Sequence, residues 1–166
     1  MILDTNGLSA VAEGEPALEP ILRKAAQVAI PVIVLGEYRY GIAQSRERKR
    51  YEQWLSEYLP KFRILEVDER TTISYAAVRM ELKKARTPIP SNDVWIAALC
   101  RQHSLALVSR DRHFDAMPKS CVRCLRQSVA ASCEPSIRHP RHLLAQPSAV
   151  YGRLTGVILQ RIPRKF

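Results

Sequence analysis

The sequence lacks any apolar run that approaches the roughly 20 residues needed to span a bilayer. Its start, MILDTNGLSA, has no basic segment and carries an aspartate at position 4, so we do not expect a signal peptide. Cysteine is scarce, with four residues among 166, and no internal repeat is visible before residue 126. These absences favour a cytoplasmic protein whose thiols are reduced.

The four cysteines do not indicate a zinc site. Cys121 and Cys124 have the spacing of a ligand pair, and Cys133 and His139 could be further ligands. However, the pair falls in an expected short strand, where residues three apart point to opposite faces. A second pair at matching spacing, which structural zinc sites normally have, is missing.

Acidic residues are also few, 16 against 26 Lys and Arg, which makes the formal net charge +10. Such a surplus favours a polyanionic partner, because basic side chains release counterions when they bind a phosphate backbone. A well-solvated surface would explain the same surplus. The charge alone therefore leaves both interpretations open.

Short apolar segments alternate with helical patterns along residues 1–126. Strands are expected over 1–3, 28–35, 63–67, 105–109 and 122–125, and helices over 20–27, 37–44, 51–59, 71–85 and 93–103. Pro31 falls inside one of these strands and suggests a strand start or a bulge there. The helix over 71–85 has an apolar stripe of Ile73, Ala76, Ala77 and Met80. The alternation predicts an α/β fold with a mostly parallel sheet that is covered by helices on both faces.

Residues 127–166 differ in composition from the rest of the chain. They hold four prolines and six Lys and Arg against a single acid, which gives a net charge of +5. A segment of this kind buries too little apolar surface to offset its backbone entropy. We predict a domain over 1–126 and a basic, proline-containing, irregular C-terminal tail, in which only 149–162 has the pattern of a short element.

Four acidic residues fall where a parallel sheet would bring them together. Asp4 closes the first expected strand, and Glu37 lies two residues past the end of the second. Asp111 lies two residues past the strand over 105–109, and Asp93 opens the helix that leads into that strand. Open parallel sheets bind ligands at the carboxyl ends of their strands. We therefore expect Asp4, Glu37 and Asp111 at one rim of the sheet, which Asp93 also reaches if the start of its helix points there.

Such a cluster is costly without a cation, since two carboxylates about 5 Å apart repel by roughly 3 kcal/mol at an effective dielectric of about 20. Oxygen ligands favour Mg²⁺ or Mn²⁺ over zinc. A hard divalent ion held by a basic protein suits phosphodiester hydrolysis. Taken singly, each acid has an ordinary structural explanation, such as the helix dipole for Asp93 or an Asx turn for Asp111. The combination is what indicates a site.

Four segments resemble the VapC-type toxins of the PIN-domain nucleases: MILDTN at the start, VIVLGEYRYGI around Glu37, PIPSNDVWIAA around Asp93 and LALVSRDRHF around Asp111. They follow one another in the family's order across residues 1 to about 125, whereas residues 127–166 resemble nothing in the family. The resemblance implies a three-layer PIN fold.

The resemblance also implies a function. The catalytic and metal-binding acids would be Asp4, Glu37, Asp93 and Asp111. They would bind Mg²⁺ or Mn²⁺, and the protein would cleave RNA endonucleolytically. Asn6 and Ser109 would be polar residues that support these acids from behind, and Asp115 would be an accessory residue. A cognate VapB-like antitoxin would block the site, and the chain would form a homodimer.

Three alternatives stand beside this hypothesis. A phosphatase of the haloacid-dehalogenase type needs an acid two residues after its nucleophile, whereas Asn6 occupies that position here. A catalytically inactive nucleic-acid-binding module would not need all four acids. An RNA-processing PIN nuclease without an antitoxin would keep the chemistry and change the biological role.

Overall fold

The computed structural model describes residues 1–117 and the backbone of residues 122–124. Its elements in chain order are β1 (Ile2–Leu3), α1 (Thr5–Ala12), η1 (Pro16–Leu18), α2 (Glu19–Arg23), β2 (Ala29–Pro31), α3 (Val32–Gln44), α4 (Arg48–Tyr58), η2 (Leu59–Lys61), β3 (Arg63–Leu65), α5 (Glu69–Ala85), α6 (Ser91–His103), β4 (Leu107–Ser109), η3 (Arg112–Ala116) and β5 (Val122–Cys124).

The five strands form one sheet in the order β3-β2-β1-β4-β5, and every pairing is parallel. The chain moves from β1 outward to β2 and β3, and then returns to the other side of β1 as β4. The order therefore reverses beside β1, and ligands of open parallel sheets bind at the carboxyl ends of the strands at such a switch point.

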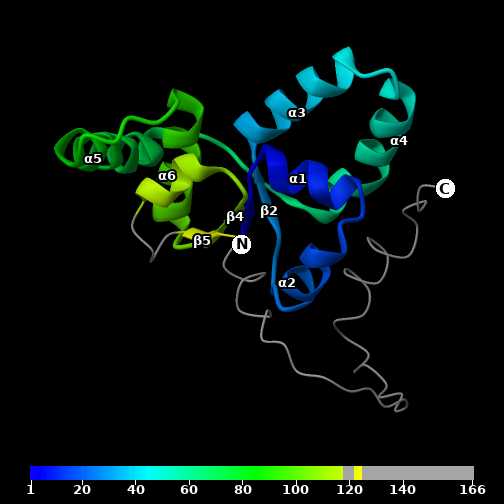
Figure 1. Ribbon diagram of the computed structural model, residues 1–166, viewed down its shortest axis with the longest axis horizontal. Helices are drawn as coiled ribbons and strands as arrows, with labels where there is room; N and C mark the ends of the chain where they lie inside the picture. The colour runs from blue at the N-terminus through cyan, green and yellow to red at the C-terminus, as the bar shows by residue number, and fades with distance from the viewer. Residues whose placement is uncertain (118–121, 125–166) are drawn as a thin grey trace, which may run out of the picture.

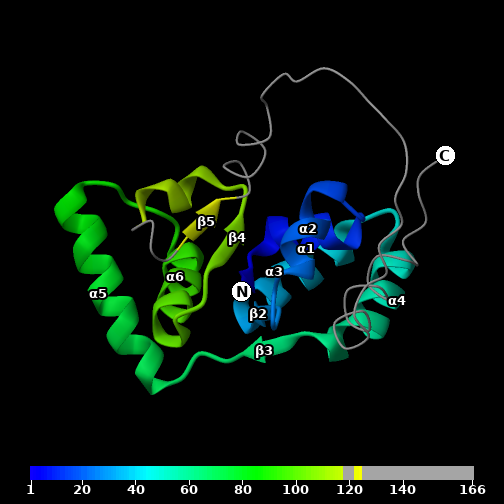
Figure 2. The same ribbon diagram turned by 90° about the horizontal axis from the view of Figure 1, so that it is seen from below.

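Helices cover both faces of the sheet, as the sequence predicts. Figure 2 views the sheet nearly edge-on, with α5 and α6 on one side and α1 to α4 on the other. Figure 1 shows the same separation, with α3 rising beyond the end of the sheet. The prediction of an α/β fold with three layers is confirmed. None of the helices in the described part of the chain combines the length and the apolar character that a membrane span requires.

Local signals explain where the helices α5 and α6 begin and end. Asp68 and Thr71 form a capping box at the start of α5, and the residue that follows α5, Arg86, lies in the left-handed region with φ 57°. Pro90 directly precedes α6, and Ser104, which follows α6, is also left-handed with φ 52°. Both helices then contribute apolar side chains to a core centred on the buried strands β1, β2 and β4.

The strand predicted over 28–35 is wrong in its second half. The strand ends at Pro31, and Val32 begins α3, so Glu37 lies on a helix and not beyond a strand. The buried side chains of α3 are Val34, Tyr38 and Ile42, which recur every four residues, as expected of a helix. An apolar run of β-branched residues fits a buried strand and a buried helical turn equally well.

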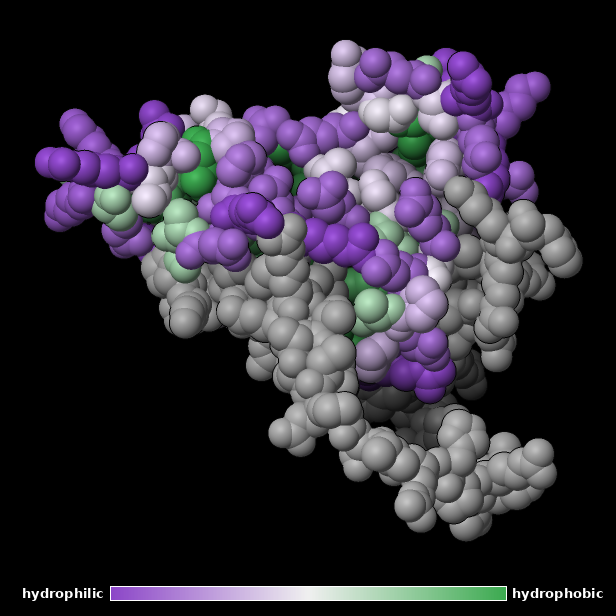
Figure 3. Space-filling view, viewed as in Figure 1, coloured by the Kyte–Doolittle hydropathy of each residue, from purple (hydrophilic) through white to green (hydrophobic). Residues whose placement is uncertain are grey.

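The stripe predicted for α5 is also wrong. Ile73 is 74% exposed and Met80 is 53% exposed, whereas Thr71, Val78 and Leu82 are buried. The helix is thus rotated away from the orientation that its larger apolar residues suggest. Figure 3 shows hydrophilic side chains over most of one face of the molecule, with apolar side chains reaching the surface over α5.

Two predictions fall largely outside the described residues. The first is the domain boundary near residue 126, with the tail over 127–166. The second concerns Cys121, Cys133 and His139, together with the side chain of Cys124.

Candidate active site

Two acidic side chains follow the two strands at the switch point. Asp4 follows β1 and caps α1, where its Oδ1 accepts the Gly7 N–H at 2.6 Å. Asp111 follows β4 by two residues and caps η3, where its Oδ1 accepts the His113 N–H at 3.0 Å. Because β1 and β4 are parallel neighbours, both carboxyl groups lie at the same end of the sheet.

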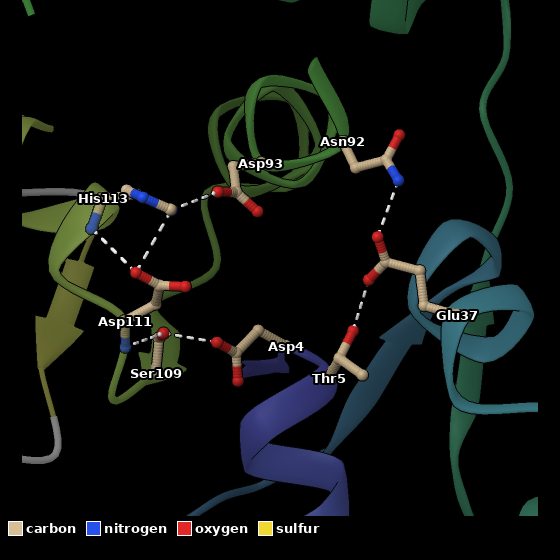
Figure 4. Close-up of polar contacts among 8 residues, drawn as sticks. All are labelled: Asp4, Thr5, Glu37, Asn92, Asp93, Ser109, Asp111 and His113. Carbon is tan, nitrogen blue, oxygen red and sulfur yellow. Dashed lines mark hydrogen bonds and ion pairs between the residues drawn. The ribbon is translucent and has the colours of Figure 1, made fainter. Parts of the chain in front are cut away.

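The other two predicted acids come from the beginnings of two helices. Glu37 lies in the second turn of α3, and Asp93 is the third residue of α6. Figure 4 shows both side chains directed toward the space that Asp4 and Asp111 face.

All four acids line one cavity of about 460 Å³, together with Asn6. The structure therefore brings together the quartet that strand ends and helix starts predict. Ser109 is buried next to the cavity, while Asp115 is exposed on η3 and is not among the residues that line it. The catalytic and metal-binding roles of these residues stay predictions.

Ser109 connects the two strand-end acids. Its hydroxyl donates to Asp4 Oδ2 and accepts the Asp111 N–H at 2.9 Å (Figure 4). The side chain is 1% exposed, so its hydrogen bonds compete little with water. Asp4 is consequently held through both oxygens, by the Gly7 N–H on one and the Ser109 hydroxyl on the other.

Glu37 is held by two residues that the sequence analysis did not single out. The Thr5 hydroxyl donates to Glu37 Oε2 at 2.5 Å, and Asn92 Nδ2 donates to Oε1 at 2.6 Å. Thr5 begins α1 and Asn92 lies in the first turn of α6, so Glu37 joins three helices at the cavity. Their positions next to Asp4 and Asp93 in the chain are the only signal that the sequence offers.

His113 is a third residue that the sequence analysis missed. Its Nδ1 lies 3.0 Å from Asp93 Oδ2 and 3.2 Å from Asp111 Oδ1 (Figure 4). Among the described residues, these three side chains form a group of donors able to hold a metal ion, with one donor atom from each within 4.8 Å of the others.

The fold and this acidic cavity coincide with a known family. A family model described as PIN domain matches residues 1–120. The chain belongs to the PIN-domain family. Ribonuclease VapC4 of Mycobacterium tuberculosis is 33% identical over 91 residues, which cover 54% of this chain and 70% of that protein. Toxin FitB of Neisseria gonorrhoeae is 31% identical over 123 residues, which cover 67% of this chain and 87% of that protein.

Solved PIN-domain structures share the architecture. VapBC2 from Rickettsia felis, bound to a DNA fragment from its promoter, superposes with a TM-score of 0.65 and 25% identity, over 74% of this chain and 96% of that one. VapBC-5 from Mycobacterium tuberculosis, a member of the VapBC family of toxin-antitoxin systems, superposes with a TM-score of 0.57 and 26% identity, over 74% and 94%. The expected resemblance to this family is confirmed.

The cavity of this PIN domain destabilises negative charge on Asp4. Burial is the largest cause that raises the pKa of Asp4, and the charges of Asp111 and Asp93 raise it further. The hydrogen bonds from Ser109 and Gly7 act in the opposite direction without cancelling the increase. A bound cation would favour the ionised form.

The cavity also destabilises the negative charge of Asp93. Burial again is the largest cause that raises its pKa, with further contributions from the charges of Asp111 and Glu37, while His113 lowers it. No lysine or arginine is among the described residues that line the cavity. The described lining therefore holds four carboxyl groups without a permanently charged basic side chain to balance them.

Proposed function

We infer that this PIN domain is an endoribonuclease that depends on a divalent metal ion and acts as the toxin of a type II toxin–antitoxin pair. The ribonuclease activity is supported by relatives named ribonuclease VapC. The toxin role is supported by Toxin FitB and by VapBC-5, a member of a family of toxin-antitoxin systems. The observation in this chain that carries the proposal is the meeting of Asp4, Glu37, Asp93 and Asp111 at one cavity.

The donor set fits a divalent cation. Several carboxylates share the cavity, two of them have a raised pKa, and no Lys or Arg among the described lining residues compensates them. Carboxylate oxygens are the ligands of Mg²⁺ and Mn²⁺. Asp4, Asp93 and Asp111 would hold such an ion, with Glu37 as a further acid across the cavity. When bound, the ion supplies charge neutralisation at the phosphodiester and a more acidic water.

The chain's own residues orient these acids. Ser109 and the Gly7 N–H fix both oxygens of Asp4, so this carboxyl group cannot turn away from the cavity. Thr5 and Asn92 hold the two oxygens of Glu37 in the same way. Polar contacts behind metal-binding acids commonly decide how well the acids are positioned.

The proposed partners follow from charge and family. An RNA substrate suits the net charge of +10, and a cytoplasmic location goes with such a substrate. A VapB-like antitoxin is proposed because the solved relatives are VapBC assemblies. A homodimer is also proposed, and the exposed Ile73 and Met80 on α5 are apolar side chains that such an interface could bury.

The decisive experiment incubates the purified chain with total RNA in EDTA, Mg²⁺ or Mn²⁺ and maps new RNA ends by sequencing. The wild type should produce discrete ends with either ion and none in EDTA. Asp4→Asn should produce none, whereas Glu57→Gln, on the exposed surface of α4, should cleave like the wild type. Cleavage by Asp4→Asn in Mn²⁺, or equal cleavage in EDTA, would overturn the proposal.

If a short reading frame lies immediately upstream, joint expression with its product then tests the toxin role. A complex that copurifies and loses cleavage supports it. An RNA-processing nuclease would remain active, with no inhibitory partner.

A further inference from the structure

The position of His113 at the cavity is set by the turn that follows Asp111. Asp111 caps η3 by accepting the His113 N–H, which places the imidazole beside both Asp111 and Asp93. The side chain is 49% exposed, while those of Asp93 and Asp111 are 17% and 31% exposed. The histidine therefore stands at the open side of the acidic cluster, with one ring nitrogen turned inward (Figure 4).

A hydrogen bond alone accounts poorly for this arrangement. The same atom, Nδ1, lies 3.0 Å from Asp93 Oδ2 and 3.2 Å from Asp111 Oδ1. One N–H points in one direction and cannot be well aligned with two acceptors at once. Moreover, Asp111 Oδ1 already accepts the backbone N–H of His113.

A shared cation accounts for it well. Ligands about 2.1 Å from one ion and at right angles to each other lie about 3 Å apart, which matches both distances from Nδ1. Asp93 Oδ1 and Asp111 Oδ2 accept no hydrogen bond from another described residue and can contribute to the same ion.

We propose that His113 is a metal ligand that acts together with Asp93 and Asp111, and that it makes the site selective for Mn²⁺ over Mg²⁺. Imidazole nitrogen binds first-row transition metals, whereas Mg²⁺ strongly prefers oxygen. An all-carboxylate site would lack this source of discrimination. The inference rests on the proposed metal-dependent function and deepens it, because it names one more ligand and the class of ion.

The first test measures ion binding without any substrate. Purified full-length chain is freed of metal with a chelator and titrated with MnCl₂ or MgCl₂ alone in a calorimeter. His113→Gln keeps a polar side chain but removes the imidazole, and His103→Gln is the matched control, because His103 lies at the opposite end of α6 from Asp93. Loss of the ligand should weaken Mn²⁺ binding at least about tenfold, a typical cost of disturbing a metal site, and change Mg²⁺ binding less than about threefold.

The second test detects the nitrogen directly. Pulsed electron paramagnetic resonance of the Mn²⁺-loaded wild type should show coupling to a ¹⁴N nucleus. The chain has four histidines, so H103Q/H139Q/H142Q leaves His113 as the single imidazole. This variant should keep the coupling, and His113→Gln should lose it. A nitrogen coupling that persists in the triple variant can come only from the imidazole of His113, and it cannot result from misfolding.

The outcomes distinguish the two proposals. Mn²⁺ bound to the wild type without nitrogen coupling overturns the role of His113, even if RNA is cleaved. Equal weakening of Mn²⁺ and Mg²⁺ binding in His113→Gln also overturns it, because the histidine would then only position the acids. A wild type that binds neither ion, and cleaves no RNA, overturns the proposed function as well.

Discussion

Replacing Asp111 by Asn should stabilise the metal-free protein while abolishing cleavage. Burial is the largest cause of the raised pKa of Asp4 and of Asp93, and the negative charge of Asp111 raises both values further. Removing that charge therefore relieves the repulsion on two neighbouring carboxyl groups at once. Asparagine caps a helix as well as aspartate does, so the bond from the His113 N–H can be kept. The substitution thus removes charge without removing packing.

The expected gain follows from the distances. Donor oxygens of Asp93 and Asp111 lie within 4.8 Å of each other. At that separation two full charges repel by about 3 kcal/mol at an effective dielectric of about 20. Partial exposure of both side chains screens this repulsion, and the attraction of Asp111 to His113 is lost in the variant. A net gain of about 1 kcal/mol remains, which corresponds to a melting temperature about 3–5 °C higher.

The gain should depend on pH in a defined direction. The folded protein holds the protons of Asp4 and Asp93 more tightly than the unfolded chain does, because both pKa values are raised. As the pH falls through the raised pKa values, both groups take up a proton in the folded state and the repulsion from Asp111 is lost. The advantage of Asp111→Asn should therefore grow as the pH rises through the raised pKa values, and it should be larger at pH 7 than at pH 4.

Thermal melts in EDTA between pH 4 and pH 8 measure this difference. Saturating Mn²⁺ should reverse the order of the two proteins, because an ion at a hundred times its Kd stabilises the folded wild type by about 2.7 kcal/mol. Asp115→Asn is the matched control on the same turn and should change stability by less than about 0.5 kcal/mol. An Asp111→Asn variant that melts at or below the wild type in EDTA at pH 7, or that gains as much at pH 4, refutes the electrostatic reasoning.

Three further predictions concern other parts of the molecule. A Cβ at Gly7 would lie 3.0 Å from the Val108 carbonyl oxygen and 3.1 Å from Asp4 Oδ1, so Gly7→Ala should cost about 1–3 kcal/mol in urea unfolding and reduce cleavage. Expression of the wild type should arrest growth of its host, whereas Glu37→Ala should not; equal arrest by both would show that the toxicity is not nucleolytic. Deletion of residues 127–166 should leave the melting temperature and cleavage unchanged and make the salt dependence of RNA binding shallower, since six Lys and Arg are removed; a truncated chain that fails to fold would contradict the boundary near residue 126.

The sheet and two of the acids were predictable from the sequence because strand ends bring distant residues together. Asp4 and Asp111 are more than a hundred residues apart in the chain, yet each follows a short buried strand. Parallel strands place their carboxyl ends at one edge, so their neighbourhood requires no knowledge of side-chain packing. For Asp93 the sequence supplied only a condition, that the start of its helix point toward this edge, and the structure meets that condition.

The sequence predicted the correct end of the sheet for Glu37, but for a reason that was partly wrong. The strand over 28–35 was expected to carry it there, whereas α3 begins at Val32 and carries it there instead. The error is local, because a parallel strand and the helix that follows it meet at the same edge. Apolar periodicity over four residues could not separate a buried strand from a helical turn, although the spacing of Val34, Tyr38 and Ile42 indicates the helix over a longer window.

Ser109 was expected behind the acids, whereas three further residues that contact them could not be predicted, because their contacts depend on side-chain direction. Thr5 neighbours Asp4 in the chain but donates to Glu37 on another helix, and Asn92 neighbours Asp93 but also reaches Glu37. His113 reaches Asp93 only because the turn of η3 points its imidazole back toward α6. Strand ends therefore determine which acids meet, whereas the turns and first helical residues after them determine how each acid is oriented. Within the described residues, selectivity for the metal ion and the substrate should accordingly reside in these short segments and not in the sheet.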